Sequence, residues 1–288
     1  MHELILHHYP NSPFAEKARL LLGFKQLSWH SVLIPPVMPK PDLTALTGGY
    51  RKTPVLQIGA DIYCDTALIA RRLEAEKATP ALFPEGQEFN VASVAQWADS
   101  VLFQHAVSLV FQPESIAVRF AALPPEAVKG FMADRAGLFS GGSASRLPLE
   151  QAQQQWPTFM ARLEQQLSRE EGDFLFGEAS LADFAMAHPL WFLMATPVTA
   201  PLASRIFSAD IRPRRPSTIC RLMESPRPEC WPKRSPPPGP VGESSRGSRP
   251  PPGHLRVTVP GRCGRHRRRS AHCAPPHAPH CSSRWPPC

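Results

Sequence analysis

The first 78 residues alternate between strand and helix patterns, and this order leaves few folds open to the chain. An apolar run at residues 4–7 and an alternating segment at 27–33 predict two short strands. Between them, apolar residues recur on one face of a predicted helix at about 12–24. Strands joined in this way run parallel, through a right-handed crossover.

A second pattern in the same region predicts an antiparallel hairpin. Residues 54–58 and 61–63 are strand-like and flank Gly59-Ala60, a plausible tight turn. Asp65 then suits the N-cap of a helix at 66–77. We therefore expect residues 1–78 to form an α/β domain with a mixed four-stranded sheet.

Beyond a linker at residues 78–87, which contains two prolines, no further strand pattern occurs before residue 205. Ser180 and Asp183 have the spacing of an N-terminal capping box. We expect an all-helical domain over residues 88–205. Its predicted helices cover residues 90–111, 124–138, 149–169 and 180–195.

The composition of residues 1–210 is that of an ordinary, mildly acidic protein with a net charge of −5. Cys64 is the single cysteine of this part and cannot form an internal disulfide, which suits a reducing compartment. The N-terminus shows no signal-peptide pattern, and no apolar run approaches the roughly 20 residues of a membrane span. We expect a cytoplasmic protein that does not enter a membrane.

Residues 211–288, the C-terminal segment, have a different composition. They hold 18 of the 35 prolines, six of the seven cysteines and a net charge of +13. Such a segment cannot bury enough apolar area to offset its ordering entropy, so we expect it to be disordered. Arg, Pro, Gly, Ser, His and Cys together are typical of a GC-rich gene read out of frame. A frameshift near 203–212 would also leave the helical domain truncated.

Three alternatives remain open for the C-terminal segment, and we favour none of them. The basic run at 265–270 (RHRRRS) could bind nucleic acid electrostatically, and the proline-rich pieces could dock to partner modules. A zinc site is the third, although no paired spacing repeats. Its ligands would come from Cys263, His266, His272, Cys273, His277, His280 and Cys281.

Four short segments, in this order, resemble the glutathione S-transferase family. They are SPFAEKARLLL from Ser12, RKTPVL from Arg51, CDTALI from Cys64, and FLFG from Phe174 followed by SLADF from Ser180. The resemblance runs from about residue 3 to about 200. It implies a thioredoxin-like N-terminal domain, a helical C-terminal domain and a homodimer.

Ser12 has a structural and a chemical interpretation. Serine before Pro13 is a favourable N-cap with proline at the first helical position. The resemblance implies that Ser12 is also the catalytic residue, which stabilises the thiolate of glutathione by its hydroxyl and by the helix N-terminus. Omega-like members have cysteine at this position, so mixed-disulfide chemistry is not expected. Tyr9 is the competing candidate for the same role.

The resemblance also implies a binding site for glutathione. Pro54 would follow a cis bond and present the backbone of Thr53 to the cysteinyl part of the tripeptide. Asp65 and Thr66 would hold the γ-glutamyl end, in addition to capping their helix. Lys40 would meet the glycyl carboxylate.

We therefore expect a glutathione transferase that uses glutathione as co-substrate, needs no metal and attacks an electrophilic small molecule. The second substrate would lie between the domains, against the helix with Trp97, Phe103 and His105. Residues at this helical spacing are more often core than site, so they indicate no particular electrophile. Cys64 is expected to be a small buried residue. The alternatives are a glutathione-binding or transferase-like interaction protein without turnover, and a glutathione-dependent isomerase.

Overall fold

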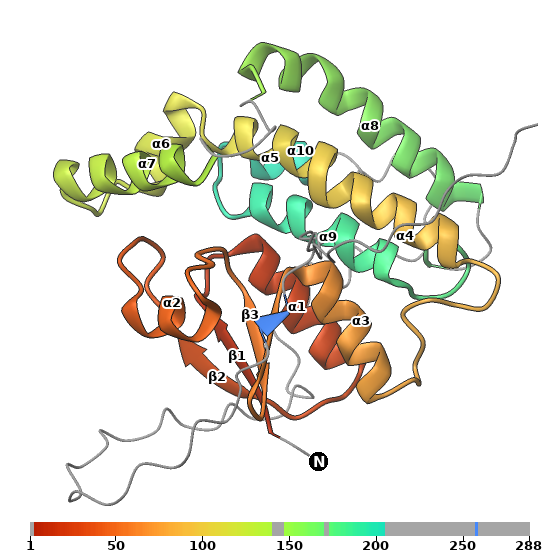
Figure 1. The fold of residues 1–288 in the computed structure, drawn as a ribbon. Helices are drawn as coiled ribbons and strands as arrows, with labels where there is room; N and C mark the ends of the chain where they lie inside the picture. The colour runs from red at the N-terminus through yellow and green to blue at the C-terminus, as the bar shows by residue number, and fades with distance from the viewer. Residues whose placement is uncertain (1–2, 140–146, 170–172, 205–256, 259–288) are drawn as a thin grey trace, which may run out of the picture.

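The computed structural model describes residues 3–139, 147–169, 173–204 and 257–258. An α/β domain and a helical domain pack against each other (Figure 1). The α/β domain contains β1 (Leu4–His8), α1 (Pro13–Phe24), β2 (His30–Leu33), α2 (Pro41–Thr47), β3 (Val55–Ile58), β4 (Asp61–Cys64) and α3 (Thr66–Glu76). The expected thioredoxin-like domain is confirmed.

The sheet has the mixed topology that the strand order predicts. β1 pairs parallel with β2 and antiparallel with β3, and β3 forms the antiparallel hairpin with β4. Gly59 turns this hairpin with a positive φ of 60°, which glycine adopts without strain. The sheet order is β2-β1-β3-β4-β5, so the sheet has one strand more than the four expected.

The additional strand is β5 (Val257–Thr258), which pairs parallel with β4. It departs from the expectation that the C-terminal segment forms no regular structure. The rest of this segment lies outside the described residues, as does the proposed frameshift region beyond Ser204. The predictions for both therefore stay predictions.

The helical domain follows the predicted boundaries closely. The expected helix at 90–111 is continuous, but it has a π-helical turn, η1, in its middle. α2, α6 and α10 are short helices that the patterns did not indicate. The elements are α4 (Glu88–Trp97), η1 (Ala98–Leu102), α5 (Phe103–Val110), α6 (Pro113–Arg119), α7 (Pro125–Phe139), α8 (Leu149–Arg169), α9 (Leu181–Met194) and α10 (Ala200–Ser204).

Helix α9 lies at the centre of the molecule, between α1 of the α/β domain and helices α4 and α5 (Figure 1). Nearly all of its residues are buried, which is why it shows no polar face. The predicted capping box is present: the Ser180 amide and hydroxyl both donate to Asp183 Oδ2, at 2.9 and 2.8 Å. The Leu175 amide donates to the other carboxylate oxygen at 2.9 Å, so the preceding loop is fixed to the same side chain.

A buried polar network joins the two domains. Lys17 of α1 contacts Asp99 Oδ2 in the π-helical turn at 2.5 Å. His188 Nε2 of α9 lies 2.9 Å from Asp99 Oδ1. The ring of Phe14 packs against the His188 ring, with 4.6 Å between their centroids. Helix α1 is therefore held against the helical domain by both charge and aromatic contact.

Candidate functional site

The strand register brings three of the predicted site segments to one end of the sheet. Val55, the first residue of β3, pairs with His7 on one side and with Cys64 on the other. The turn after β1, the residues before β3 and the residues after β4 therefore lie next to one another. These three places carry Ser12, Thr53 with Pro54, and Asp65 with Thr66.

Ser12 begins α1 directly after the β1 turn. Its backbone is extended and its hydroxyl accepts a hydrogen bond from the Ala15 amide at 3.2 Å. The residue is only 3% exposed. Because the hydroxyl oxygen serves as acceptor here, its own proton can be donated to another group. The predicted N-cap role is confirmed.

Thr53 and Pro54 precede β3, and the peptide bond between them is cis, as the resemblance implied. Pro54 is buried. Among the described residues, the amide and carbonyl of Thr53 have no hydrogen-bond partner. This backbone can therefore pair with an extended peptide.

Lys40 is buried and its ammonium lies beside Thr53. Its Nζ is 3.2 Å from Thr53 Oγ1 and 3.4 Å from the Arg51 carbonyl. Burial, with the nearby cations of Arg135 and Arg51, lowers the pKa of Lys40 to about 8, while Asp134 opposes this shift. The ammonium has no carboxylate in direct contact among the described residues, which leaves it able to bind an anion.

The helical domain reaches this site through α7. Asp134 accepts hydrogen bonds from Arg51 Nη2 at 2.6 Å and from the Met38 amide at 3.0 Å. Arg135, the next residue, donates to the carbonyl of Pro36. The loop that carries Lys40 is thus held by side chains of the helical domain.

Asp65 and Thr66 begin α3. The Asp65 side chain accepts from the Ala67 amide at 2.8 Å, so its predicted capping role is confirmed, and the residue is exposed. Thr66 is buried at the first helical position. Burial and the Asp65 charge raise the pKa of the Tyr50 hydroxyl, which keeps that group neutral.

Tyr9 lies in the turn before Ser12, and its carbonyl accepts from the Ser12 amide at 3.2 Å. Lys40 Nζ is 5.6 Å from the centroid of the Tyr9 ring. Arg119, at the end of α6, is near enough to Tyr9 for the two side chains to interact electrostatically. One cation of each domain therefore lies near the Tyr9–Ser12 turn.

Two of the three residues named on the helix that was expected to face the second substrate point away from the α/β domain. Trp97 and His105 pack against Phe159 of α8, at 5.3 and 4.8 Å between ring centroids. Only Phe103 faces the α/β domain, with its ring 4.6 Å from that of Phe14. The three side chains are separated because they project from different faces of one helix. The sequence did not indicate which of these faces packs against the α/β domain.

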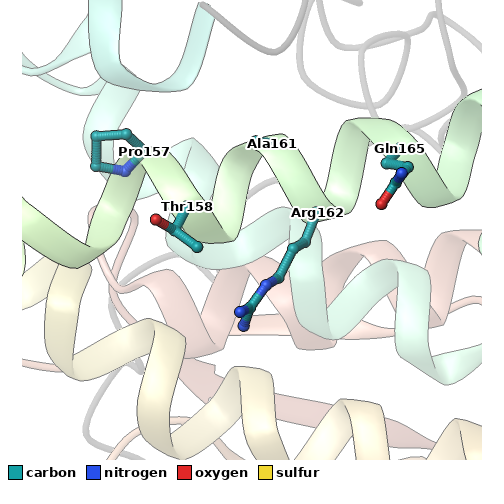
Figure 2. A pocket seen from close by; sticks show the side chains of 5 residues that line it. All are labelled: Pro157, Thr158, Ala161, Arg162 and Gln165. Carbon is teal, nitrogen blue, oxygen red and sulfur yellow. The ribbon is translucent and has the colours of Figure 1, made fainter.

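Two surface grooves lie on the helical domain, and neither contains a predicted site residue. One, of about 490 Å³, runs along α8 and is lined by Pro157, Thr158, Ala161, Arg162 and Gln165 (Figure 2). The other, of about 290 Å³, is lined by Ser108, Phe111, Gln112, Pro113, Leu147, Pro148 and Leu149. Their lining residues are not those that the sheet register brings together.

Cys64 is fully buried, and burial with the Asp65 charge raises the pKa of its thiol to about 11. A neutral, inaccessible thiol is not a redox centre, in agreement with the expectation from the sequence. Within the described ranges, no three His, Cys, Asp or Glu side chains gather where they could hold a metal ion. Nor does any described helix combine the length and apolar character needed to cross a bilayer.

Sequence reasoning missed the residues that the helical domain adds to the site. Arg119, Asp134 and Arg135 lie on α6 and α7, far along the chain from Ser12. No local motif marks them, because only the packing of the domains brings them near the Lys40 loop. Arg51 was within a recognised segment, but its salt bridge to Asp134 could not be foreseen.

Comparison with known proteins agrees with this arrangement. Residues 6–81 match the family model of the glutathione S-transferase N-terminal domain. Comparison with curated proteins gives no match. The fold is similar to that of a glutathione S-transferase from Rhodospirillum rubrum F11, with 20% identity, a TM-score of 0.50, and coverage of 76% of this chain and 99% of that one.

A higher identity is found with the crystal structure of a GST-like protein from Pseudomonas syringae. The two chains are 60% identical with a TM-score of 0.57, over 72% of this chain and 67% of the other. Together with the N-terminal domain match and the mixed sheet, this identity shows that the chain belongs to the glutathione S-transferase family.

Proposed function

We propose that the protein is a glutathione transferase that activates the thiol of glutathione for attack on an electrophilic small molecule. One observation supports this most directly. The Ser12 hydroxyl lies buried at the N-terminus of α1 and accepts from the Ala15 amide, so its own proton is available to a different acceptor. A thiolate is an acceptor of the required kind.

The energetic requirement is modest. A free thiol has a pKa of about 8.5, so only a few per cent is thiolate at pH 7. Lowering that pKa by about two units needs roughly 2.7 kcal/mol of preferential stabilisation of the anion. One hydrogen bond to a charged group contributes about 1.5–3 kcal/mol, and a helix N-terminus adds about 0.3–1 kcal/mol. Ser12 would supply both from one position.

The remaining site residues fit the charges of the tripeptide. The unpartnered backbone of Thr53 would bind the cysteinyl backbone as an added strand, and Lys40 would bind the glycyl carboxylate. At the other end, the exposed Asp65 carboxylate would bind the ammonium of the γ-glutamyl group. Thr66 and the N-terminus of α3 would bind its carboxylate.

We also propose that the protein is a cytoplasmic homodimer. Phe89 of α4 is 82% exposed, and Val101 in the following turn is also exposed. A large aromatic side chain in water loses the stabilisation of burial, and a second copy of the chain would cover it.

Binding of glutathione without turnover is the alternative, and a glutathione-dependent isomerase is a narrower one. A protein that only binds glutathione would have no need to stabilise its thiolate. A buried hydroxyl at the N-terminus of α1 therefore supports catalysis, and the choice among electrophiles decides between transfer and isomerisation.

The decisive experiment compares Ser12→Ala with the wild-type protein over a panel of electrophiles with glutathione. Removal of one thiolate donor should lower turnover by about tenfold or more and raise the pKa of the bound thiol, seen as thiolate absorbance against pH. The affinity for glutathione, measured by calorimetry, should change little. Ser168→Ala, which removes a hydroxyl from the exposed end of α8, is the matched control.

Three results would change the proposal. Equal rates for Ser12→Ala and wild type would transfer the role to Tyr9 or to backbone amides. Glutathione binding without turnover of any electrophile would support the binding protein instead. Absence of glutathione binding would reject both.

A further inference from the structure

Arg119 carries a buried hydrogen-bond donor that nothing in the described chain accepts. Its guanidinium carbon lies 5.1 Å from the centroid of the Phe192 ring of α9. Its Nη1 atom is buried and has no hydrogen-bond partner among the described residues. A guanidinium is always charged and carries five donor hydrogens, so an unmatched, buried one calls for an acceptor.

The described part of the chain compensates this charge poorly. Burial lowers the pKa of Arg119, and no carboxylate among the described residues opposes this shift. Arg51, by contrast, forms a salt bridge with Asp134 at 2.6 Å. Within the described ranges, one arginine near the site is therefore paired with a carboxylate and the other is not.

Arg119 is connected to the thiol end of the site by a row of aromatic rings. Phe14 follows Ser12 by two residues and packs on Phe103, with 4.6 Å between centroids. Phe103 stacks in turn on Phe192 at 6.3 Å, and Phe192 lies under Arg119. A continuous row of packed rings thus runs from the residue proposed to activate the thiol to the unpaired cation, and two of its members, Phe103 and Phe192, are buried at 8% and 5% exposure.

Glutathione leaves this cation without a partner. In the proposed function its two carboxylates go to Lys40 and to Thr66, and neither needs Arg119. We therefore assign the anion at Arg119 to the second substrate. We propose that Arg119 binds a carboxylate of the acceptor, and that the acceptors are small electrophiles with an aromatic or similar apolar body and one carboxylate.

This inference rests on the proposed function, and conjugates that need no turnover can test it. S-benzylglutathione and S-(4-carboxybenzyl)glutathione differ by one carboxylate, and calorimetry with the full chain gives the affinity of each. Wild type should bind the carboxylated conjugate about tenfold or more tightly than the neutral one, because a charge-assisted hydrogen bond is added. Arg119→Met should reduce this ratio to about one, while its affinity for S-benzylglutathione stays near that of wild type.

Arg162→Met is the matched control, since it removes the same charge from the exposed groove on α8 (Figure 2). It should keep the wild-type ratio. Arg119→Gln, which retains donors without the charge, is measured beside Arg119→Met in case the latter does not fold. It should lose most of the preference.

The outcomes are distinct. Equal wild-type affinity for the two conjugates, or a preference that survives in the Arg119 variants, overturns this inference and leaves the proposed function intact. Failure of wild type to bind S-benzylglutathione and glutathione rejects the proposed function, and the inference with it.

Discussion

Replacing Asp99 by asparagine should destabilise the protein far more than replacing an exposed carboxylate. Asp99 is the shared partner of Lys17, at 2.5 Å, and of His188, at 2.9 Å. The Lys17 side chain is 0% exposed and the Asp99 side chain 15%. In Asp99→Asn the amide oxygen can still accept from His188, but the Lys17 charge is left buried without a counter-charge.

The size of the effect follows from that unpaired charge. Removing one partner of a buried ion pair typically costs about 3–5 kcal/mol, and the remaining hydrogen bond to His188 places Asp99→Asn near 3 kcal/mol. Lys17→Met leaves a carboxylate that still contacts His188 and some solvent, so a loss of about 1–2 kcal/mol is expected. The double variant Lys17→Met/Asp99→Asn leaves no unpaired charge. It should therefore be more stable than Asp99→Asn alone.

Urea unfolding followed by fluorescence measures these free energies. The slope of the unfolding free energy against urea concentration is compared between variants, so that a change in stability is separated from a change in the unfolded state. The control is Glu88→Gln, which breaks the exposed Arg71–Glu88 pair, where Glu88 is 65% exposed. It should change stability by about 0.5 kcal/mol or less. The reasoning is refuted if Asp99→Asn costs no more than Glu88→Gln. It is also refuted if the double variant loses the full sum of the single losses.

Three further predictions concern pH, assembly and the C-terminal segment. Burial lowers the pKa of His188 in the folded protein below the ordinary value that it has in the unfolded chain. At a pH between the two values, the unfolded chain binds a proton at this histidine and the folded protein does not. The free energy of unfolding should thus fall as the pH is lowered from about 7 to 5, and His188→Asn should flatten this profile. Phe89→Ser should shift a dimer toward monomer in analytical ultracentrifugation, and an unchanged mass would reject Phe89 as an interface residue. Truncation after residue 210 should leave the melting temperature nearly unchanged, because it removes only the β5 pairing from the described sheet. A loss above about 3 °C, roughly 1 kcal/mol for a chain of this size, would contradict this.

Elements that bury one regular face were predicted well from the sequence. Helix α8 spans Leu149–Arg169, as its periodicity indicated, because one stripe of apolar residues packs on the domain and the opposite face is polar. Helix α2, over Pro41–Thr47, was missed because its seven residues are too few to show a period. Its C-cap, Gly48 in the left-handed conformation, was the signal available in the sequence.

In the candidate site, residues positioned by their neighbours in sequence could be predicted, whereas residues positioned by contacts between distant segments could not. Ser12 and Asp65 could be assigned to helix N-termini because capping depends on residues close in sequence. The proximity of Lys40 to Thr53 depends on how a loop folds back, and that of Arg119 to Tyr9 depends on the docking of two domains. No spacing in the sequence encodes either contact.

Helix α9 links the two ends of the proposed active site. His188 packs against Phe14, which follows Ser12 by two residues. Phe192 follows His188 by four residues and packs against Arg119. Residues four apart lie on one face of a helix, so a single rigid element supports both the thiol end and the acceptor end. The spacing between an activated thiolate and an acceptor carboxylate would then be set by α9. A change that tilts this helix should therefore alter the choice of acceptor before it alters the affinity for glutathione.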